Sequence, residues 1–383
     1  MLAIVWLLYG AFGLNMRSIA PLVTPILADL RMEYAEMGMV LGSWQLVYTP
    51  VAIFAGIAMD RWGIRKTLFA GALIMALSEG LRYFATGFTT LLPAVAIFGI
   101  GAPLISIGAP KTISLWFKGN DRAAAVGIYT TAPWIGGLFA IGATNSLVMP
   151  LTGQSWRLVF ASYSAVTALF ALTWWLLARD TRRTKESGGD SLIRTFLNLL
   201  KVRNVRMVIL AGLLVLFIDH GFTQWLPKML ENKGISAEAA GFTASIPLIT
   251  AIPAVFLVPR LVPGHSRGRF FALWAFLAVI ALVTSTTASS VLLTVGLILY
   301  GLTVPTMLPM LMLTLMNEPE VGPERMGMAG GLFFTIAELG GFIGPSLMGV
   351  TVDATGGFLL GTSLLAGAGL ILSGLMFFLR DTR

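Results

Sequence analysis

Apolar runs of about 20 residues recur along the whole chain, and they constrain its fold more than any other feature. Each run is long enough for a helix to cross the roughly 30 Å hydrocarbon core of a membrane. Because backbone polar groups in lipid must hydrogen-bond within their own segment, such runs predict helices. Charged residues make up only 11% of the 383 residues and hydrophobic residues 56%, which excludes an ordinary soluble domain. The sequence therefore predicts an all-α membrane protein that crosses the bilayer many times.

We expect twelve transmembrane helices, with ends placed to within several residues. In chain order they cover about residues 2–28, 34–59, 67–84, 90–117, 122–147, 156–178, 207–230, 238–261, 269–286, 290–316, 324–351 and 357–379. A charged stretch at 179–190 separates the sixth helix from the seventh, and it continues into an amphipathic stretch at 191–206 that we expect to lie along the membrane surface.

An internal repeat relates the two halves of the chain. Arg122-Ala-Ala-Ala-Val-Gly127 opens the fifth predicted helix, and Arg325-Met-Gly-Met-Ala-Gly330 opens the eleventh. Gly136-Gly137 is followed about 203 residues later by Gly340-Gly341. The repeat predicts two pseudo-symmetric six-helix bundles. The corresponding domains are an N-terminal bundle at 1–178, a cytoplasmic linker at 179–206 and a C-terminal bundle at 207–383.

The basic residues predict the orientation of the chain. With both termini inside, the inner segments hold roughly 19 Lys and Arg residues and the outer segments 5, and such an excess marks the cytoplasmic side. The formal net charge of +8 therefore reflects topology and does not indicate binding to nucleic acid. We expect a multi-pass protein of the cell inner (plasma) membrane whose partners are the lipid bilayer and a small solute.

A short basic stretch between the second and third predicted helices combines glycine, acidic and basic residues at a specific spacing. It reads Gly56-Ile-Ala-Met-Asp60-Arg61-Trp62-Gly63-Ile64-Arg65-Lys66. The stretch resembles the signature loop between helices 2 and 3 of major facilitator superfamily transporters, where it latches helices that rock against each other. The alternative is a generic basic turn between two membrane helices. The resemblance implies a cytoplasmic gate formed by Gly56, Asp60, Arg61, Gly63, Arg65 and Lys66.

The resemblance covers the whole chain and implies a solute site near the membrane midplane, between two bundles. It also implies a protein that works as a monomer. Leu14-Asn15-Met16-Arg17 resembles an element of the cyanate/nitroimidazole permeases, and Trp225-Leu226-Pro227 resembles one found in those permeases and in organic anion:proton symporters. Pro110-Lys111-Thr-Ile-Ser-Leu-Trp116-Phe117 resembles instead nitrate/oxalate-type carriers or haem/choline exporter-type carriers. The substrate therefore stays open.

Ionisable residues inside predicted helices are the main candidates for a transport site, because charge in hydrocarbon usually faces a cavity or a partner. Arg17 lies near the middle of the first helix, and the repeat maps it onto Asp219 and His220 in the seventh. A guanidinium offers a fork of donors to a carboxylate and keeps its charge. We therefore expect Arg17 to bind an anion and Asp219, with His220, to exchange a proton. The alternative is a permanent Arg17–Asp219 ion pair that only ties the halves together.

Further polar and aromatic residues complete the predicted site. Glu338, in the middle of the eleventh helix, either titrates during transport or is a neutral packing residue. Glu79 and Arg82 are one helical turn apart and are expected to form a local pair. Aromatic walls with a few polar groups suit a small organic solute. The expected substrate contacts, besides Arg17, are Asn15, Gln45, Tyr48, Tyr129, Trp134, Gln224 and Tyr300.

Catalytic and cofactor-binding patterns are missing from the sequence. It has no phosphate-binding Gly-Lys-Ser/Thr loop, no metal-ligand spacing around its two histidines and no cysteine. We expect no cofactor, no metal and no enzymatic activity. The main hypothesis is a secondary active transporter of a small organic or inorganic anion or weak acid, working by alternating access with proton coupling. The alternatives are a multidrug or metabolite exporter and a non-transporting membrane receptor or sensor on the same fold.

Overall fold

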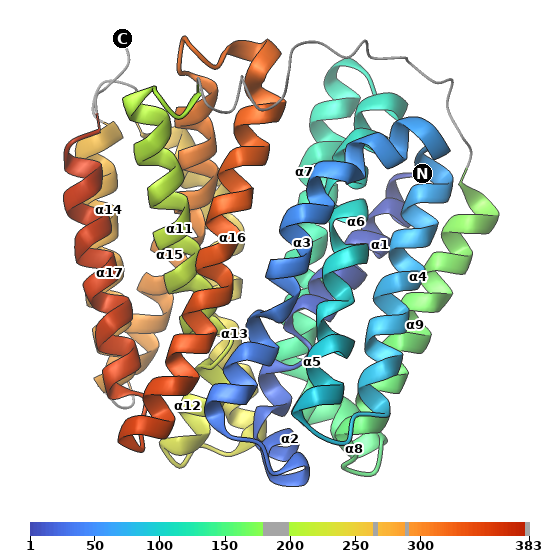
Figure 1. The fold of residues 1–383 in the computed structure, drawn as a ribbon, viewed down its shortest axis with the longest axis vertical. Coiled ribbons are helices and arrows are strands. Elements are labelled where there is room, and N and C mark those ends of the chain that lie inside the picture. Colours follow the sequence, from blue (N-terminus) through green and yellow to red (C-terminus); the bar gives the residue numbers. More distant parts are fainter. Residues whose placement is uncertain (179–198, 263–266, 288–290, 380–383) are drawn as a thin grey trace. The chain divides into compact units, whose positions relative to one another are not determined.

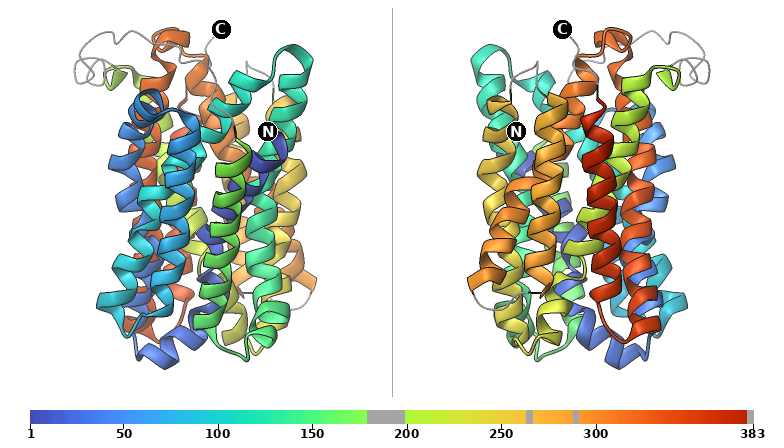
Figure 2. Two further views of the ribbon diagram at one scale, coloured as in Figure 1. Left: turned by 90° about the vertical axis from the view of Figure 1, so that its right-hand side faces the viewer. Right: turned by 90° about the vertical axis from the view of Figure 1, so that its left-hand side faces the viewer.

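The structure is a computed structural model in which residues 1–178, 199–262, 267–287 and 291–379 are described. Helices joined by short turns make up these residues, and no β-strand occurs among them (Figures 1 and 2). The prediction of an all-α protein is confirmed. The charged stretch at 179–190 lies outside the described residues, as does the amphipathic stretch up to residue 198.

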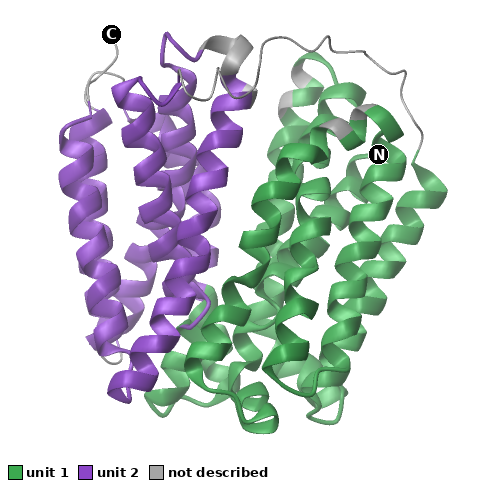
Figure 3. Cartoon of the chain, viewed as in Figure 1, with its two compact units in different colours: residues 1–186, 226–245 green, residues 187–225, 246–383 purple. Residues whose placement is uncertain are grey.

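The chain forms two compact units, shown in different colours in Figure 3. Unit 1 comprises Met1–Glu186 and Leu226–Ser245, and unit 2 comprises Ser187–Trp225 and Ile246–Arg383. The segment Leu226–Ser245 contains the end of the seventh predicted helix and the start of the eighth, and it is grouped with the N-terminal residues. The division into domains at 1–178, 179–206 and 207–383 stays a prediction.

Unit 1 contains the helices of the N-terminal half of the chain and one short helix from its second half. They are α1 (Leu2–Arg17), the 3-10 helix η1 (Ala20–Leu22), α2 (Val23–Leu30), α3 (Tyr34–Trp62), α4 (Ile64–Tyr83), α5 (Phe88–Ala96), α6 (Phe98–Trp116), α7 (Gly119–Ala143), the π-helical turn η2 (Thr144–Val148), α8 (Met149–Leu151), α9 (Trp156–Leu177) and α12 (Leu226–Asn232). In Figure 1, the turn between α3 and α4 lies at the same end of unit 1 as the N-terminus, and α2 and α8 lie at the opposite end.

Unit 2 contains five long helices, and it shares a sixth, α13 (Ala237–Leu261), with unit 1. The five are α11 (Arg203–Thr223), α14 (Arg267–Thr287), α15 (Val291–Met316), α16 (Gly322–Thr355) and α17 (Leu359–Phe377). Within this unit α11 packs along α16, and α14 packs along α15 and α17.

Eleven stretches of helix in the described residues are long and apolar enough to cross a membrane. The remaining predicted span, at residues 67–84, corresponds to α4, which is a helix of 20 residues. Charged residues near both of its ends, among them Glu79 and Arg82, lower its apolar character. The count of twelve spans therefore stays a prediction, although every predicted span corresponds to a helix or to a broken helix.

The first span is not the single helix that the apolar run at residues 2–28 predicts. Helix α1 ends at Arg17, and η1 and α2 continue after a break. Pro21 supplies the reason, because it has no N–H to donate to the carbonyl of Arg17 four residues earlier. The chain bends here instead, and the N–H of Leu22 donates to the carbonyl of Ile19 at 2.8 Å. The break places Arg17 at a helix end.

Glycines allow two helix pairs to cross at very short distance, one pair in each unit. In unit 1, a Cβ added at Gly136 of α7 would lie 2.0 Å from the carbonyl oxygen of Gly10 in α1. In unit 2, a Cβ added at Gly340 of α16 would lie 2.0 Å from the carbonyl oxygen of Leu213 in α11. Gly136 and Gly340 are matched by the sequence repeat, and their partners are also about 203 residues apart. The same crossing is therefore built in both units from equivalent glycines.

Candidate functional site

The turn between α3 and α4 is held against the end of α9. Gly63 forms the turn with φ of 84°, a left-handed conformation that glycine adopts without steric cost. The Arg65 guanidinium lies over the Trp175 ring, 4.7 Å from its centre, and its Nε donates to the Trp175 carbonyl at 3.1 Å. The indole N–H of Trp174 donates to the Arg65 carbonyl at 2.9 Å. These contacts hold Arg65 against α9, which is another helix of unit 1.

The other predicted gate residues lie around this turn. Arg61 and Lys66 are exposed. No described atom lies within 4 Å of the position that a Cβ would take on Gly56. The side chain of Asp60 lies outside the described part of the structure. The role of these residues as a gate stays a prediction.

Arg17, the last residue of α1, is a buried cation. It is only 8% exposed, and within the described residues no hydrogen bond or ion pair reaches its guanidinium. A guanidinium keeps its positive charge and carries five N–H donors. Buried cations are normally paired, because an unpaired charge in a low-dielectric environment is strongly unfavourable. Binding of an anion by Arg17 stays a prediction.

The residues on both sides of Arg17 are tied to other helices of unit 1. The Asn15 amide donates to the carbonyl of Ala11 at 2.8 Å and to Oγ1 of Thr167 in α9 at 3.0 Å. The Ser18 hydroxyl lies 2.8 Å from Oε1 of Glu79 in α4. Because both amide hydrogens of Asn15 are occupied, its predicted contact with substrate would have to use its side-chain oxygen. That contact stays a prediction.

The predicted pair between Glu79 and Arg82 is confirmed. Nη1 of Arg82 lies 2.8 Å from Oε1 of Glu79, and both side chains are 1% exposed or less. The sequence predicts a local pair between neighbours on a helix. The structure adds that the pair is fully buried and reaches α1 through Ser18.

Aromatic rings form a continuous row through the interior of unit 1. Its consecutive ring centres are 5.3 to 5.9 Å apart. In order, the rings belong to Tyr129, Tyr9, Phe12, Phe98, Trp44 and Tyr48. Sequence reasoning selected the residues at both ends of the row and missed Tyr9, Phe12 and Phe98. The spacing of Tyr9 and Phe12, one helical turn apart and shortly before Arg17, is a signal that could have indicated them.

The other predicted residues of unit 1 occupy different environments. The Tyr48 hydroxyl is hydrogen-bonded to the Ser106 hydroxyl at 2.9 Å. Gln45 is fully buried, whereas Trp134 is half-buried. Their contact with a substrate stays a prediction.

In unit 2, the structure brings together three of the predicted residues. The hydroxyl of Tyr300, on α15, donates to Oδ1 of Asp219, on α11, at 3.4 Å. Nε2 of His220 lies 4.0 Å from Oδ2 of Asp219. The Thr223 hydroxyl donates to the carbonyl of Asp219 at 2.6 Å. Asp219 is therefore a carboxylate with neutral or titratable neighbours in its own unit. Its pairing with Arg17 stays a prediction.

Glu338 is a second buried carboxyl group of unit 2. It lies in α16, two residues before the close crossing at Gly340, and it is 8% exposed. Among the described residues, Oε2 of Glu338 has no hydrogen-bond partner. Gln224 is 4% exposed, and the neighbouring Trp225 donates from its indole N–H to the Pro345 carbonyl at 3.0 Å. Whether Glu338 titrates during transport or is a neutral packing residue stays a prediction.

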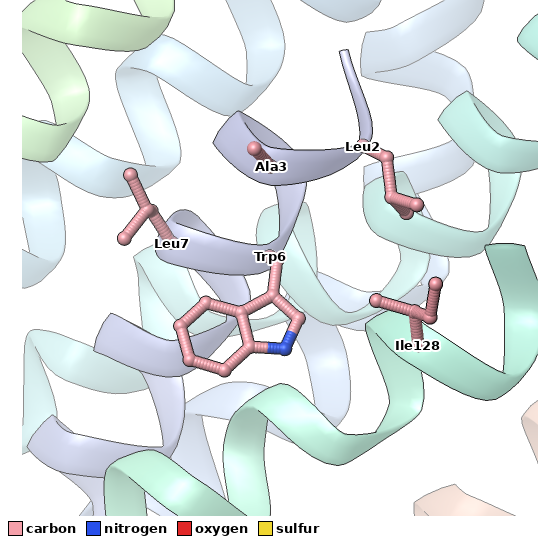
Figure 4. Close-up of a pocket in the computed structure, with 5 residues that line it drawn as sticks. All are labelled: Leu2, Ala3, Trp6, Leu7 and Ile128. Atoms are coloured by element: carbon pink, nitrogen blue, oxygen red, sulfur yellow. The ribbon is translucent and has the colours of Figure 1, made fainter.

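Two apolar hollows run along α1. One, of about 510 Å³, is lined by Leu2, Ala3, Trp6, Leu7 and Ile128, and Figure 4 shows these side chains. The other, of about 400 Å³, is lined by residues of α1, α7, η2 and α9. None of the predicted site residues lines either hollow. Among the described residues, no three His, Asp or Glu side chains come together as metal ligands would.

Comparison of the sequence with known protein families shows which family the chain belongs to. The sequence profile described as Major Facilitator Superfamily matches residues 5–345. The chain belongs to the major facilitator superfamily. Members of this superfamily are transporters, so the prediction of a transporter and not an enzyme is confirmed.

Relatives and a solved structure agree with this assignment. The hexuronate transporter of Bacillus subtilis (strain 168) is 25% identical over an alignment of 393 positions, which covers 94% of this chain and 89% of the relative. The D-galactonate transporter of Escherichia coli O6:H1 is 28% identical over 249 residues, or 58% of this chain and 57% of the relative. The crystal structure of the nucleoside transporter NupG superimposes with a TM-score of 0.81 at 18% identity and covers 98% of each chain. The last likeness shows that the chain has the same fold as the nucleoside transporter.

Proposed function

We propose that the protein is a secondary active transporter that moves a small carboxylate anion across the inner membrane by alternating access and with proton coupling. A hydroxy acid such as a hexuronate is the substrate class that its similarity to a hexuronate transporter and a D-galactonate transporter supports. Both solutes carry a carboxylate and several hydroxyl groups. A site for them needs one cationic anchor together with neutral donors and aromatic surface.

The proposal rests on the burial of Arg17 and on its lack of a partner among the described residues. Its guanidinium is buried and has no ion-pair or hydrogen-bond partner among the described residues. A carboxylate can accept two parallel N–H bonds from such a fork, which gives both affinity and orientation. The row of rings on α1, α3, α6 and α7 provides apolar surface in the same unit.

Proton coupling is assigned in this proposal to the carboxyl groups of unit 2. Asp219 has a hydroxyl and an imidazole beside it, and Glu338 has a buried oxygen without a partner in the described structure. Neither carboxyl group has an Arg or Lys partner among the described residues of its own unit. In this proposal each of the two carboxyl groups takes up a proton and releases it during the transport cycle.

The orientation and assembly belong to the same proposal. The excess of basic residues in the segments assigned to the inside supports cytoplasmic termini and a cytoplasmic linker at 179–206. The sequence repeat, together with the matching glycine crossings, supports two bundles as the moving parts. We propose that the protein acts as a monomer.

The natural absence of cysteine allows a direct test of Arg17. The variant Arg17→Cys, purified and reconstituted in proteoliposomes, should lose D-glucuronate uptake by about thirtyfold or more, as expected when a buried charged partner is removed. Reaction with 2-aminoethyl methanethiosulfonate places a positive charge at this thiol and should restore part of the uptake. The neutral methyl methanethiosulfonate and the negatively charged 2-sulfonatoethyl methanethiosulfonate should not restore uptake. Mass spectrometry verifies that each reagent has reacted with the thiol.

The outcomes separate the candidate functions. Uptake that survives Arg17→Cys with unchanged KM would remove the anion-binding role. Flux of lipophilic cations that depends on Asp219 or Glu338 would favour an exporter, because those carboxylates would then bind the solute. Ligand binding without flux of any solute would favour a receptor or sensor.

A further inference from the structure

A fully buried polar cluster in unit 1 meets the chain at the residue after Arg17. Ser18 is 0% exposed, and its hydroxyl lies 2.8 Å from both Oε1 of Glu79 and the carbonyl oxygen of Asn15. Nη1 of Arg82 donates to the same hydroxyl at 2.7 Å and to Oε1 of Glu79 at 2.8 Å. The cluster therefore connects α4 to the break that follows α1.

A second layer holds the cluster in place. Nη2 of Arg82 lies 3.2 Å from the Ser78 hydroxyl, which donates to the Ala94 carbonyl of α5 at 2.7 Å. The Arg82 guanidinium also lies over the Phe160 ring of α9, 5.4 Å from its centre. The cluster thus reaches α5 and α9 as well, and its position is fixed from three sides.

Stability alone does not explain this ion pair. A buried pair is often no more stable than apolar residues of the same volume, because both ions lose their hydration. The pair is also incompletely satisfied, since Oε2 of Glu79 and Nε of Arg82 have no hydrogen-bond partner in the described structure. Its hydrogen bonds beyond α4 go to Ser18, next to the unpaired guanidinium.

We propose that Ser18, Glu79 and Arg82 are positioning residues that set the affinity of Arg17 for the transported anion. The inference rests on the proposed function of Arg17. After α1 ends at Arg17, a short 3-10 turn replaces the α-helical hydrogen bonds, and the break needs a further support. The cluster supplies it on one side, and the bond from Asn15 to Thr167 supplies it on the other. Because Glu79 is neutralised by Arg82, the cluster holds the backbone without adding a net charge.

Ser18→Ala is the mildest change that disconnects the cluster from α1. In proteoliposomes it should raise the KM for D-glucuronate about tenfold while the maximal rate per inserted molecule stays within about twofold of the wild type. Ser164→Ala is the matched control. The Ser164 hydroxyl joins α9 to α4 through the Ala76 carbonyl at 2.7 Å and does not touch the break. Its KM should stay within about twofold of the wild-type value.

A second variant separates positioning from simple stabilisation. Glu79→Leu combined with Arg82→Met removes both charges and keeps apolar volume, so it avoids an unpaired buried ion. The double variant should fold, run as a single species in size-exclusion chromatography, and show the same rise in KM as Ser18→Ala. A folded double variant with the KM of the wild type would overturn the proposal. If it does not fold, Ser18→Ala decides the question.

A double-mutant cycle with Arg17→Lys shows whether Ser18 acts through Arg17. A lysine lacks the planar fork, so its binding depends less on precise orientation. We expect Ser18→Ala to raise KM less than about threefold in the Arg17→Lys background. An equal, tenfold rise in both backgrounds would refute positioning. If Arg17→Lys alone leaves KM unchanged, the proposed function fails and this inference fails with it. If only Arg17→Lys raises KM, positioning fails and the proposed function stands.

Discussion

The close helix crossings of the two units make a quantitative prediction for Gly136→Ala and Gly340→Ala. In each case the new Cβ would lie 2.0 Å from a backbone carbonyl oxygen of the partner helix, and a Cβ contact under 3.0 Å is essentially never observed. Since the obstacle is backbone and not a flexible side chain, the helices must separate by about 1 Å or more. Overpacking of this kind lowers the free energy of unfolding by about 1–3 kcal/mol.

Each of these glycines has a matched control on the same helix. Gly127 in α7 and Gly331 in α16 are exposed, and no described atom lies within 4 Å of the position of an added Cβ. Alanine at these positions meets no obstacle and reduces the conformational freedom of the unfolded chain. Gly127→Ala and Gly331→Ala should therefore raise the free energy of unfolding by up to about 1 kcal/mol.

Thermal unfolding in detergent micelles measures the difference. The chain contains 10 tryptophans, so intrinsic fluorescence reports unfolding without a label. Gly136→Ala and Gly340→Ala should melt below the wild type, and the two controls at or above it. If Gly136→Ala melts with or above Gly127→Ala, the close crossing does not exist in solution and the argument from the repeat is refuted for unit 1.

Three further predictions concern the gate, a buried acid and the proposed proton site. Arg65→Gln removes the contacts with Trp175 and should lower the maximal uptake rate severalfold with little change in KM, whereas a large rise in KM would place Arg65 in the substrate site. Burial raises the pKa of Glu318, which lies in the connection between α15 and α16; the Asn204 hydrogen bond opposes this shift and the nearby Glu320 charge adds to it. An acid whose pKa is raised on folding stabilises the fold below its unfolded pKa and loses that contribution as pH rises through the folded pKa. The melting temperature should therefore fall from about pH 4.5 upward in the wild type more than in Glu318→Gln, and parallel curves would contradict this role. Glu338→Gln should abolish uptake driven by an imposed pH gradient while exchange of labelled for unlabelled substrate continues, and normal gradient-driven uptake would exclude Glu338 from coupling.

Much of the helical architecture could be predicted from the apolar runs, because in lipid each run has only one simple way to satisfy its backbone groups. The break after Arg17 has a cause in the sequence, because Pro21 cannot donate to the Arg17 carbonyl. The apolar run by which the span was predicted does not show where the helix bends. The grouping of Leu226–Ser245 with unit 1 depends on tertiary packing and has no signal in hydropathy.

The charged residues of the candidate site could be predicted from the sequence, whereas most of the contacts that hold them in place could not. Arg17, Asp219 and Glu338 stand out because ionisable residues are rare in apolar segments. The sequence also predicts the pair between Glu79 and Arg82, since it depends only on helical spacing. Its connection to Ser18 could not be predicted, because those residues are about 60 positions apart and meet only through packing. The rings of Tyr9, Phe12 and Phe98 look like ordinary core residues until their contacts are seen.

Binding of D-glucuronate to the purified protein, measured by calorimetry beside D-glucose, tests the central claim most directly because the two solutes differ mainly in the carboxylate. The wild type should bind D-glucuronate at least about tenfold more tightly than D-glucose, and Arg17→Gln should remove that preference. Arg157→Gln is the control, since Arg157 is a partly exposed arginine of the same unit that already pairs with Asp29. It should keep the preference. An Arg17→Gln variant that still prefers D-glucuronate as strongly as the wild type would contradict the account.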